Sequence, residues 1–209
     1  MASSMIHLVI AKKIKEKANI KMDNEKDYYL GSIAPDLSKQ IGKNKIESHF
    51  LINTKNDVPN IKIFTKRYPT FKYNSFNLGY FTHLYVDKIW FEEFIPTLTD
   101  FDSIKLLDGT VYSTEPKEIT QMIYSDYTNL NIKLIENYDL DLSLFYEDFV
   151  VPKTNLKEIP VDKLDILINK MGILIENSKE VKAYSFDLYP IEEFINKAID
   201  EIVDELKKY

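Results

Sequence analysis

The chain has 209 residues, of which 44% are hydrophobic and 29% charged, a balance typical of a water-soluble globular protein with room for one sizeable domain. Its formal net charge of −6 argues against non-specific binding to nucleic acid, because such binding rests on basic side chains that displace counterions from phosphate. The absence of cysteine excludes disulfide scaffolds, thiol nucleophiles and thiolate zinc sites.

The first half of the chain shows a helical spacing of apolar residues in three segments. A serine at position 3 or 4 is suited to cap the first segment, and Asn74 or Ser75 is suited to cap the third. Pro59 lies in the first turn of the second segment, and Pro35 ends whatever helix precedes it. We therefore predict helices over about 4–18, 57–68 and 76–94.

The second half carries further helical segments and few signs of strands. A helix is expected to follow Asp102, and Asp108-Gly109-Thr110 predicts a turn. Weak strand-like alternation is confined to residues 110–113 and 183–188. The remaining predicted helices run from Thr114-Glu115-Pro116 to about Tyr138, over 161–175 and over 190–206. Together the patterns predict an all-α, multi-helix bundle.

All three histidines lie before residue 84 in apolar surroundings. His7 falls in the first predicted helix, His49 in Ser48-His49-Phe50, and His83 four residues before Asp87 on the third predicted helix. Because residues four apart share one helix face, His83 and Asp87 can reach the same cation. Imidazole and carboxylate are the ligands that zinc takes where no thiolate is available. The same spacing also suits a plain His–Asp hydrogen bond, so a core without any metal is the alternative.

The order of these motifs resembles the bacterial zinc-dependent phospholipase C family, which shares its fold with single-strand-specific zinc nucleases. The resemblance spans roughly residues 5–95. It implies an all-α fold with a zinc cluster at the bottom of a cleft, where phosphate esters are hydrolysed. The motifs that carry it are His7, Gly31-Ser32-Ile33-Ala34-Pro35-Asp36, Ser48-His49-Phe50 and Gly79-Tyr80-Phe81-Thr82-His83-Leu84-x-x-Asp87.

The resemblance implies one metal site made by Asp36, His49, His83 and Asp87. It implies a second site at His7, with the Asp87 carboxylate bridging the two ions. It also implies a metal-bound hydroxide as the attacking group, with Asp36 orienting or deprotonating the attacking water. The trinuclear members add two histidines and a glutamate further along the chain, and no histidine follows His83 here. One or two zinc ions are therefore expected, with manganese or iron as alternatives.

Asp126, on the long predicted helix, is a further candidate ligand for the second ion, and its alternative role is that of a solvated or capping aspartate. The expected function is that of a metal-dependent phosphoesterase-like hydrolase acting on a phosphodiester or phospholipid-type substrate. Its partner is then a small-molecule or lipid phosphate ester. The alternative is a non-catalytic, metal-stabilised binding or structural protein that retains only the core metal site.

The whole chain, 1–209, is expected to form one helical domain, with the metal-site motifs in 5–95 and a helical remainder in 96–209. No apolar run approaches the roughly 20 residues that a transmembrane helix needs. No signal peptide is evident, so a cytoplasmic location is expected. The pattern indicates no particular oligomeric state.

Overall fold

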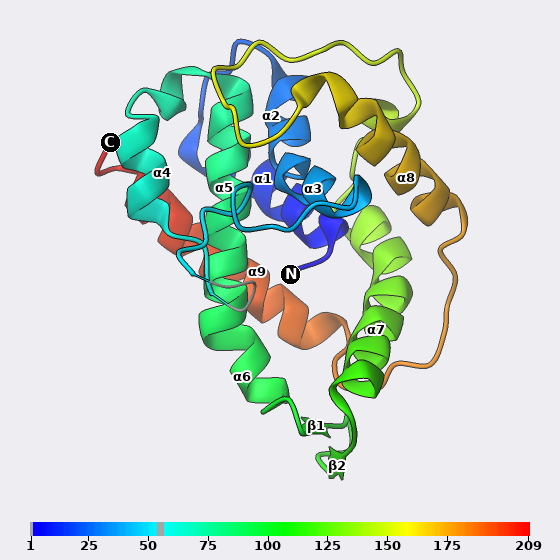
Figure 1. Cartoon of the computed structure of the whole chain (residues 1–209). Helices are drawn as coiled ribbons and strands as arrows, with labels where there is room; N and C mark the ends of the chain where they lie inside the picture. Colours follow the sequence, from blue (N-terminus) through cyan, green and yellow to red (C-terminus); the bar gives the residue numbers. More distant parts are fainter. Residues whose placement is uncertain (1, 54–56) are drawn as a thin grey trace.

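The computed structural model describes residues 2–53 and 57–209. Within these residues helices predominate, which confirms the all-α prediction (Figure 1). None of the described helices is long and apolar enough to cross a bilayer. The helices are α1 (Ser4–Ala18), α2 (Glu25–Gly31), α3 (Leu37–Gln40), α4 (Ile61–Arg67), α5 (Ser75–Ile89), α6 (Ile95–Leu98), α7 (Pro116–Asn137), α8 (Leu164–Glu176) and α9 (Leu188–Leu206).

Side-chain caps set the start of the helices that carry the metal-site motifs. The Ser3 hydroxyl accepts from the backbone N–H of Ile6 at 3.3 Å and so caps α1. The Asn74 side chain accepts from the N–H of Asn77 at 2.9 Å and caps α5. The predicted helix over 57–68 is shorter than expected, because the cap of α4 is Asn60 and Pro59 therefore lies outside it.

The segment after α5 differs from the continuous helix predicted to Phe94. The α-helix ends at Ile89, a π-helical turn spans Trp90–Phe94, and α6 follows directly. The buried indole of Trp90 stacks on the Phe94 ring at a centroid distance of 4.3 Å and meets the Phe194 ring of α9 at 5.0 Å. These ring contacts hold the π-helical turn against the core.

The helix predicted to follow Asp102 is wrong. Two strands, β1 (Ser103–Lys105) and β2 (Val111–Ser113), form an antiparallel hairpin there instead. Its turn contains Gly109 at a φ of 85°, and the Leu106 N–H donates to the Thr110 carbonyl at 2.8 Å. The turn signal at 108–110 was correct, and it closes a hairpin rather than separating two helices. The second strand-like segment, 183–188, forms no strand.

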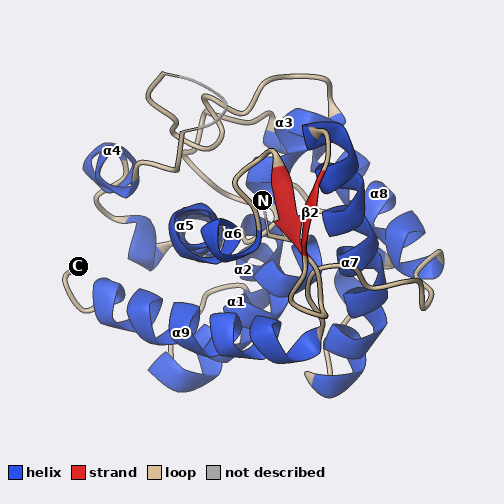
Figure 2. Ribbon diagram, turned by 90° about the horizontal axis from the view of Figure 1, so that it is seen from below, coloured by secondary structure: helices blue, strands red, loops and turns tan. Residues whose placement is uncertain are grey.

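The core is built from the apolar faces of helices that are distant in the sequence. α9 runs along one side of the bundle next to α1, while α7 and α8 line another side (Figure 2). The buried residues of α9 form a stripe along one face, at the helical spacing seen in the sequence. The residues of that stripe are Ile191, Phe194, Ile195, Ala198, Ile199, Ile202 and Leu206.

Helices α2 and α5 pack closely against each other, and a pair of glycines permits this contact. A Cβ on Gly31 would overlap the carbonyl oxygen of Phe76, and a Cβ on Gly79 would overlap that of Tyr28. Only residues without a side chain fit two backbones at this distance. The crossing brings the end of α2, and with it the Ser32 carbonyl, against the middle of α5.

Candidate metal centre

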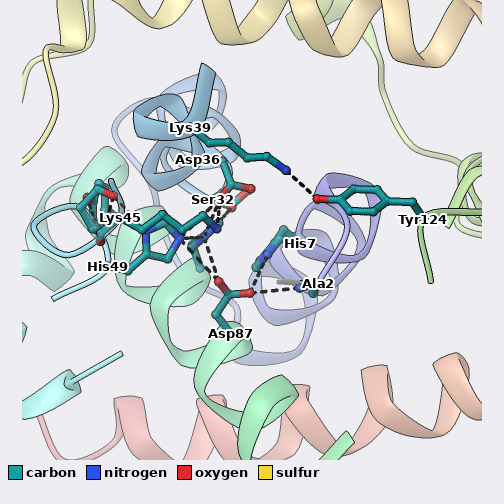
Figure 3. Close-up of polar contacts among 12 residues, drawn as sticks. Ala2, His7, Ser32, Asp36, Lys39, Lys45, His49, Asp87 and Tyr124 are labelled. Atoms are coloured by element: carbon teal, nitrogen blue, oxygen red, sulfur yellow. Dashed lines mark hydrogen bonds and ion pairs between the residues drawn. The ribbon is translucent and has the colours of Figure 1, made fainter. Parts of the chain in front are cut away.

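The five ligand residues predicted from the motifs meet at one place inside the bundle, between α1, α5 and the segment that follows α2 (Figure 3). α1 supplies His7, and α5 supplies His83 and Asp87 one turn apart. Asp36 ends the 3-10 turn Ala34–Asp36, and His49 lies in the loop before α4. His7, His83 and Asp87 are completely buried, while His49 is 2% and Asp36 6% exposed.

Two imidazoles face each other through nitrogen atoms that carry no proton. His83 Nδ1 donates to the Ser32 carbonyl at 2.8 Å, and His49 Nδ1 donates to the Ser48 hydroxyl at 2.9 Å, which itself donates to the Lys45 carbonyl. This assignment of the tautomers leaves a lone pair on each Nε2. The two Nε2 atoms are 3.3 Å apart. Two lone pairs at that separation repel each other unless a cation lies between them.

The His7 side of the cluster holds polar atoms without hydrogen bonds. The His7 ring stacks on the His83 ring with centroids 3.9 Å apart and planes 8° apart. Its Nε2 lies 3.4 Å from Asp87 Oδ1, yet neither ring nitrogen makes a hydrogen bond with any described residue. Asp87 Oδ2 makes none with the described residues either. Each buried polar atom without a hydrogen bond lowers the free energy of unfolding by about 1–3 kcal/mol, and coordination of a cation removes that penalty.

The carboxylates tie the cluster into two overlapping sets. Asp36 Oδ1 lies 3.5 Å from His49 Nε2 and 4.0 Å from His83 Nε2. Asp87 Oδ2 lies 3.5 Å from His49 Nε2 and 3.7 Å from His83 Nε2. Donor atoms within 4.8 Å of one another define the sets His7, His83 and Asp87, and Asp36, His49 and His83. Both sets fit the nitrogen and oxygen ligands of zinc.

Burial and charge hold these side chains in the forms that bind a metal. Burial lowers the pKa of His49 and lowers the pKa of His83 further, so both imidazoles are neutral near pH 7. Burial alone would raise the pKa of Asp36 and of Asp87. For Asp36, the contact with His49, the charge of nearby Lys45 and the imidazole of His83 together outweigh burial and hold the carboxyl pKa below its usual value. For Asp87, the contact with His7, the N-terminal amino group and His83 together do the same. Neutral imidazole and ionised carboxylate are the species that coordinate divalent cations.

The structure does not bring Asp126 into this cluster. The Asp126 carboxylate accepts from the backbone N–H groups of Tyr184, Ser185 and Phe186 at 2.6, 3.0 and 3.4 Å. Asp126 is completely buried, and these donors all belong to the segment that leads into α9. Its carboxylate therefore joins α7 to that segment, which is the role of a capping aspartate rather than of a metal ligand.

Replacing Asp126 with alanine tests this role. We expect the free energy of unfolding to fall by roughly 3 kcal/mol, because three buried or half-buried backbone N–H groups lose an acceptor. Denaturant titration measures that loss, and metal analysis of the folded variant is expected to give the wild-type stoichiometry. A folded variant that has lost one equivalent of metal would instead make Asp126 the second-site ligand.

Several groups that orient the cluster were not predicted from the sequence. The Ser32 carbonyl and the Ser48 hydroxyl fix the tautomers of two histidines, although both serines lie in the recognised motifs. The backbone N–H of Ala2 donates to Asp87 Oδ1 at 3.1 Å. Lys45 Nζ lies 3.4 Å from Asp36 Oδ1. Because backbone groups and tertiary lysine contacts leave no spacing in the sequence, only the adjacency of Ser48 and His49 could have indicated them.

Two pockets open onto the cluster. One, of about 250 Å³, is lined by His49 and Asp87 together with Lys39 and Lys45. The other, of about 140 Å³, reaches Asp36. Lys39 on α3 donates to the Tyr124 hydroxyl of α7 at 2.5 Å, and this bridge lines both pockets (Figure 3). The ligand set is thus buried on its inner side and accessible from the side where the two lysines lie.

The comparisons with known proteins give one match. Residues 6–90 match the family described as zinc dependent phospholipase C, while neither the curated proteins nor the solved structures give a match. The matched segment runs from α1 to the start of the π-helical turn and contains every residue of the cluster. The part of the chain that builds the metal centre is therefore similar to the zinc-dependent phospholipase C family.

Proposed function

We propose that the protein is a metal-dependent phosphoric ester hydrolase. The observation that carries the proposal is the buried cluster of three imidazoles and two carboxylates, whose unpaired atoms fit a cation and which opens onto a pocket with two lysines. The family match supports zinc as the metal and a lipid or another phosphate ester as the substrate.

The donor sets indicate how zinc would be held. Asp36, His49 and His83 would hold one ion, with Asp87 within reach. His7 and Asp87 would hold a second, because the single lone pair of His83 can bind only one ion. One or two ions are thus proposed, and manganese or iron suits the same nitrogen and oxygen donors. Zinc bound there acts as a Lewis acid that polarises a phosphoryl oxygen and acidifies a water molecule.

The remaining chemistry belongs to residues of the chain. Hydrolysis forms a bond between the water oxygen and phosphorus and breaks the bond between phosphorus and the leaving oxygen. We assign the proton of the attacking water to the Asp36 carboxylate, which lines one of the pockets. Lys45, 3.4 Å from Asp36, and Lys39 at the rim place positive charge where the non-bridging phosphate oxygens would lie.

A non-catalytic protein that uses the metal for stability is the second candidate. The complete burial of His7, His83 and Asp87 favours it, because structural metal sites are closed. The two candidates differ in what the metal does when bound. A structural metal raises the melting temperature without turnover, whereas a hydrolase also needs the open side at His49 and Asp36.

Hydrolysis of 4-nitrophenyl phosphodiesters by zinc- and manganese-loaded protein tests the proposal. We expect metal-dependent turnover that His49→Ala lowers at least about a hundredfold, because the substitution removes a ligand on the open side. An exposed surface variant, Lys117→Ala on α7, serves as control and is expected to keep wild-type activity. Metal-loaded protein that melts at a higher temperature but hydrolyses no ester would favour the non-catalytic candidate.

A further inference from the structure

An apolar groove continues from the mouth of the metal site along α7. It has a volume of about 220 Å³ and shares Phe91 and Tyr124 with the pocket that His49 and Asp87 line. In a chain with 29% charged residues, the described residues that line this groove include none with a charge. Its apolar side chains come from the π-helical turn after α5, from α6, from the turn before β1 and from α7: Phe91, Ile95, Phe101, Ile119, Ile123 and Tyr124.

Phe101 is held at the rim of this groove in an unfavourable way. Its side chain is 67% exposed, and its φ of 79° lies in the left-handed region that residues other than glycine and asparagine avoid. The Thr99 hydroxyl accepts from the Phe101 N–H at 3.0 Å, and Asp100 accepts from the N–H groups of Asp102 and Ser103 at 3.2 and 2.8 Å. These local hydrogen bonds fix the conformation of the turn, and the aromatic ring of Phe101 faces solvent. Neither burial nor backbone preference favours a phenylalanine there, and its exposed ring offers an apolar contact at the rim of the groove.

The surroundings of the metal centre change from charged to apolar in one direction. Lys39 and Lys45 lie at the cluster, Tyr124 and Phe91 form the junction, and the uncharged groove lies beyond them. Tyr124 is 47% and Phe91 37% exposed, so both rings offer apolar surface at the junction. This order matches an amphipathic molecule that has a phosphate at one end and a hydrocarbon chain at the other.

We propose that the groove between α6 and α7 is a subsite for the hydrocarbon part of the substrate, with Phe101 and Ile123 as the residues that set the preference for a long chain. The proposal rests on the proposed function, since it places the phosphate at the metal centre. It makes an amphipathic phosphate ester the substrate, rather than a small polar one.

Two matched series of ligands test the subsite. The first consists of methyl, butyl and octyl 4-nitrophenyl phosphate, used below their critical micelle concentrations. The second consists of methyl- and octylphosphonate, which are not hydrolysed, titrated into zinc-loaded protein by calorimetry. We expect kcat/KM to rise at least about tenfold from the methyl to the octyl ester, and octylphosphonate to bind about tenfold more tightly than methylphosphonate.

Phe101→Asn is the informative variant, because asparagine tolerates positive φ and the fold is expected to gain rather than lose stability. We expect it to remove most of the octyl advantage, about a tenfold loss, while its activity on the methyl ester stays at the wild-type level. Ile123→Asn on α7 is expected to do the same from the opposite wall. Tyr73→Asn, at a residue that is 80% exposed and lies outside the groove, is the control and should keep the octyl advantage.

The outcomes separate this proposal from the proposed function. Equal kcat/KM for methyl and octyl esters, or an octyl advantage that both variants retain, would overturn the subsite and leave the hydrolase intact. If no ester is hydrolysed, the hydrolase proposal fails. The phosphonate titration then decides the subsite alone, and equal affinities for methyl- and octylphosphonate would refute it.

Discussion

Replacing Gly79 with alanine is expected to destabilise the protein by about 3 kcal/mol or more and to lower its metal affinity. The added methyl group would overlap the Tyr28 carbonyl oxygen and approach the Ser32 N–H, so α2 and α5 must move apart. That movement withdraws the Ser32 carbonyl from His83 Nδ1. The hydrogen bond between these two groups fixes the tautomer of His83 that binds metal. Denaturant unfolding and a zinc competition titration measure the two effects.

Gly172→Ala is the matched control for this substitution. Gly172 lies inside α8, where a Cβ would meet the Phe145 carbonyl oxygen at 3.8 Å, an ordinary contact distance. Alanine there should stabilise the helix by roughly 0.5–1 kcal/mol and leave the metal affinity unchanged. Similar effects of Gly79→Ala and Gly172→Ala on stability would show that the close crossing of α2 and α5 does not position the site.

Asp87→Asn is expected to separate the stability of the metal-free protein from metal binding. Asparagine keeps the shape of the side chain and the acceptor for the Ala2 N–H, and its amide can donate to His7 or His49. The metal-free variant should therefore fold and unfold near the temperature of the metal-free wild type. The wild type should gain about 4 kcal/mol when free zinc is 1,000-fold above its Kd, and the variant should gain almost none.

Scanning calorimetry with and without zinc gives both quantities for Asp87→Asn. Asp165→Asn, at an exposed carboxylate on α8, controls for the loss of a negative charge and should behave as the wild type does. If the Asp87→Asn variant gains as much stability from zinc as the wild type, Asp87 is not a ligand.

The part of the site that could be predicted from the sequence is the part built from side chains at helical spacing. His83 and Asp87 lie one turn apart on α5, and a histidine near the start of α1 reaches them because both helices pack in the core. Asp36 and His49 lie outside regular helices, so no periodicity placed them. Their place in the site was predicted from the resemblance of their motifs to a known family.

The second half of the chain shows why the rest could not be predicted. Asp126 stands on a helix in a pattern open to several roles, and its partners are backbone groups almost sixty residues away. The hairpin at 103–113 follows from turn hydrogen bonds around Gly109 and not from alternation of apolar residues. That residues 1–209 form one domain stays a prediction, which a single cooperative unfolding transition would support.

Metal content by mass spectrometry, on protein purified without a metal-binding tag, tests the central claim most directly. Wild-type protein is expected to carry one or two equivalents of zinc, manganese or iron. His83→Ala is expected to lose at least one equivalent, because its ring nitrogen lies within reach of both donor sets. Two equivalents would place an ion at His7 as well. A wild-type protein that holds no stoichiometric metal, even after incubation with zinc, would contradict the assignment of the cluster as a metal centre.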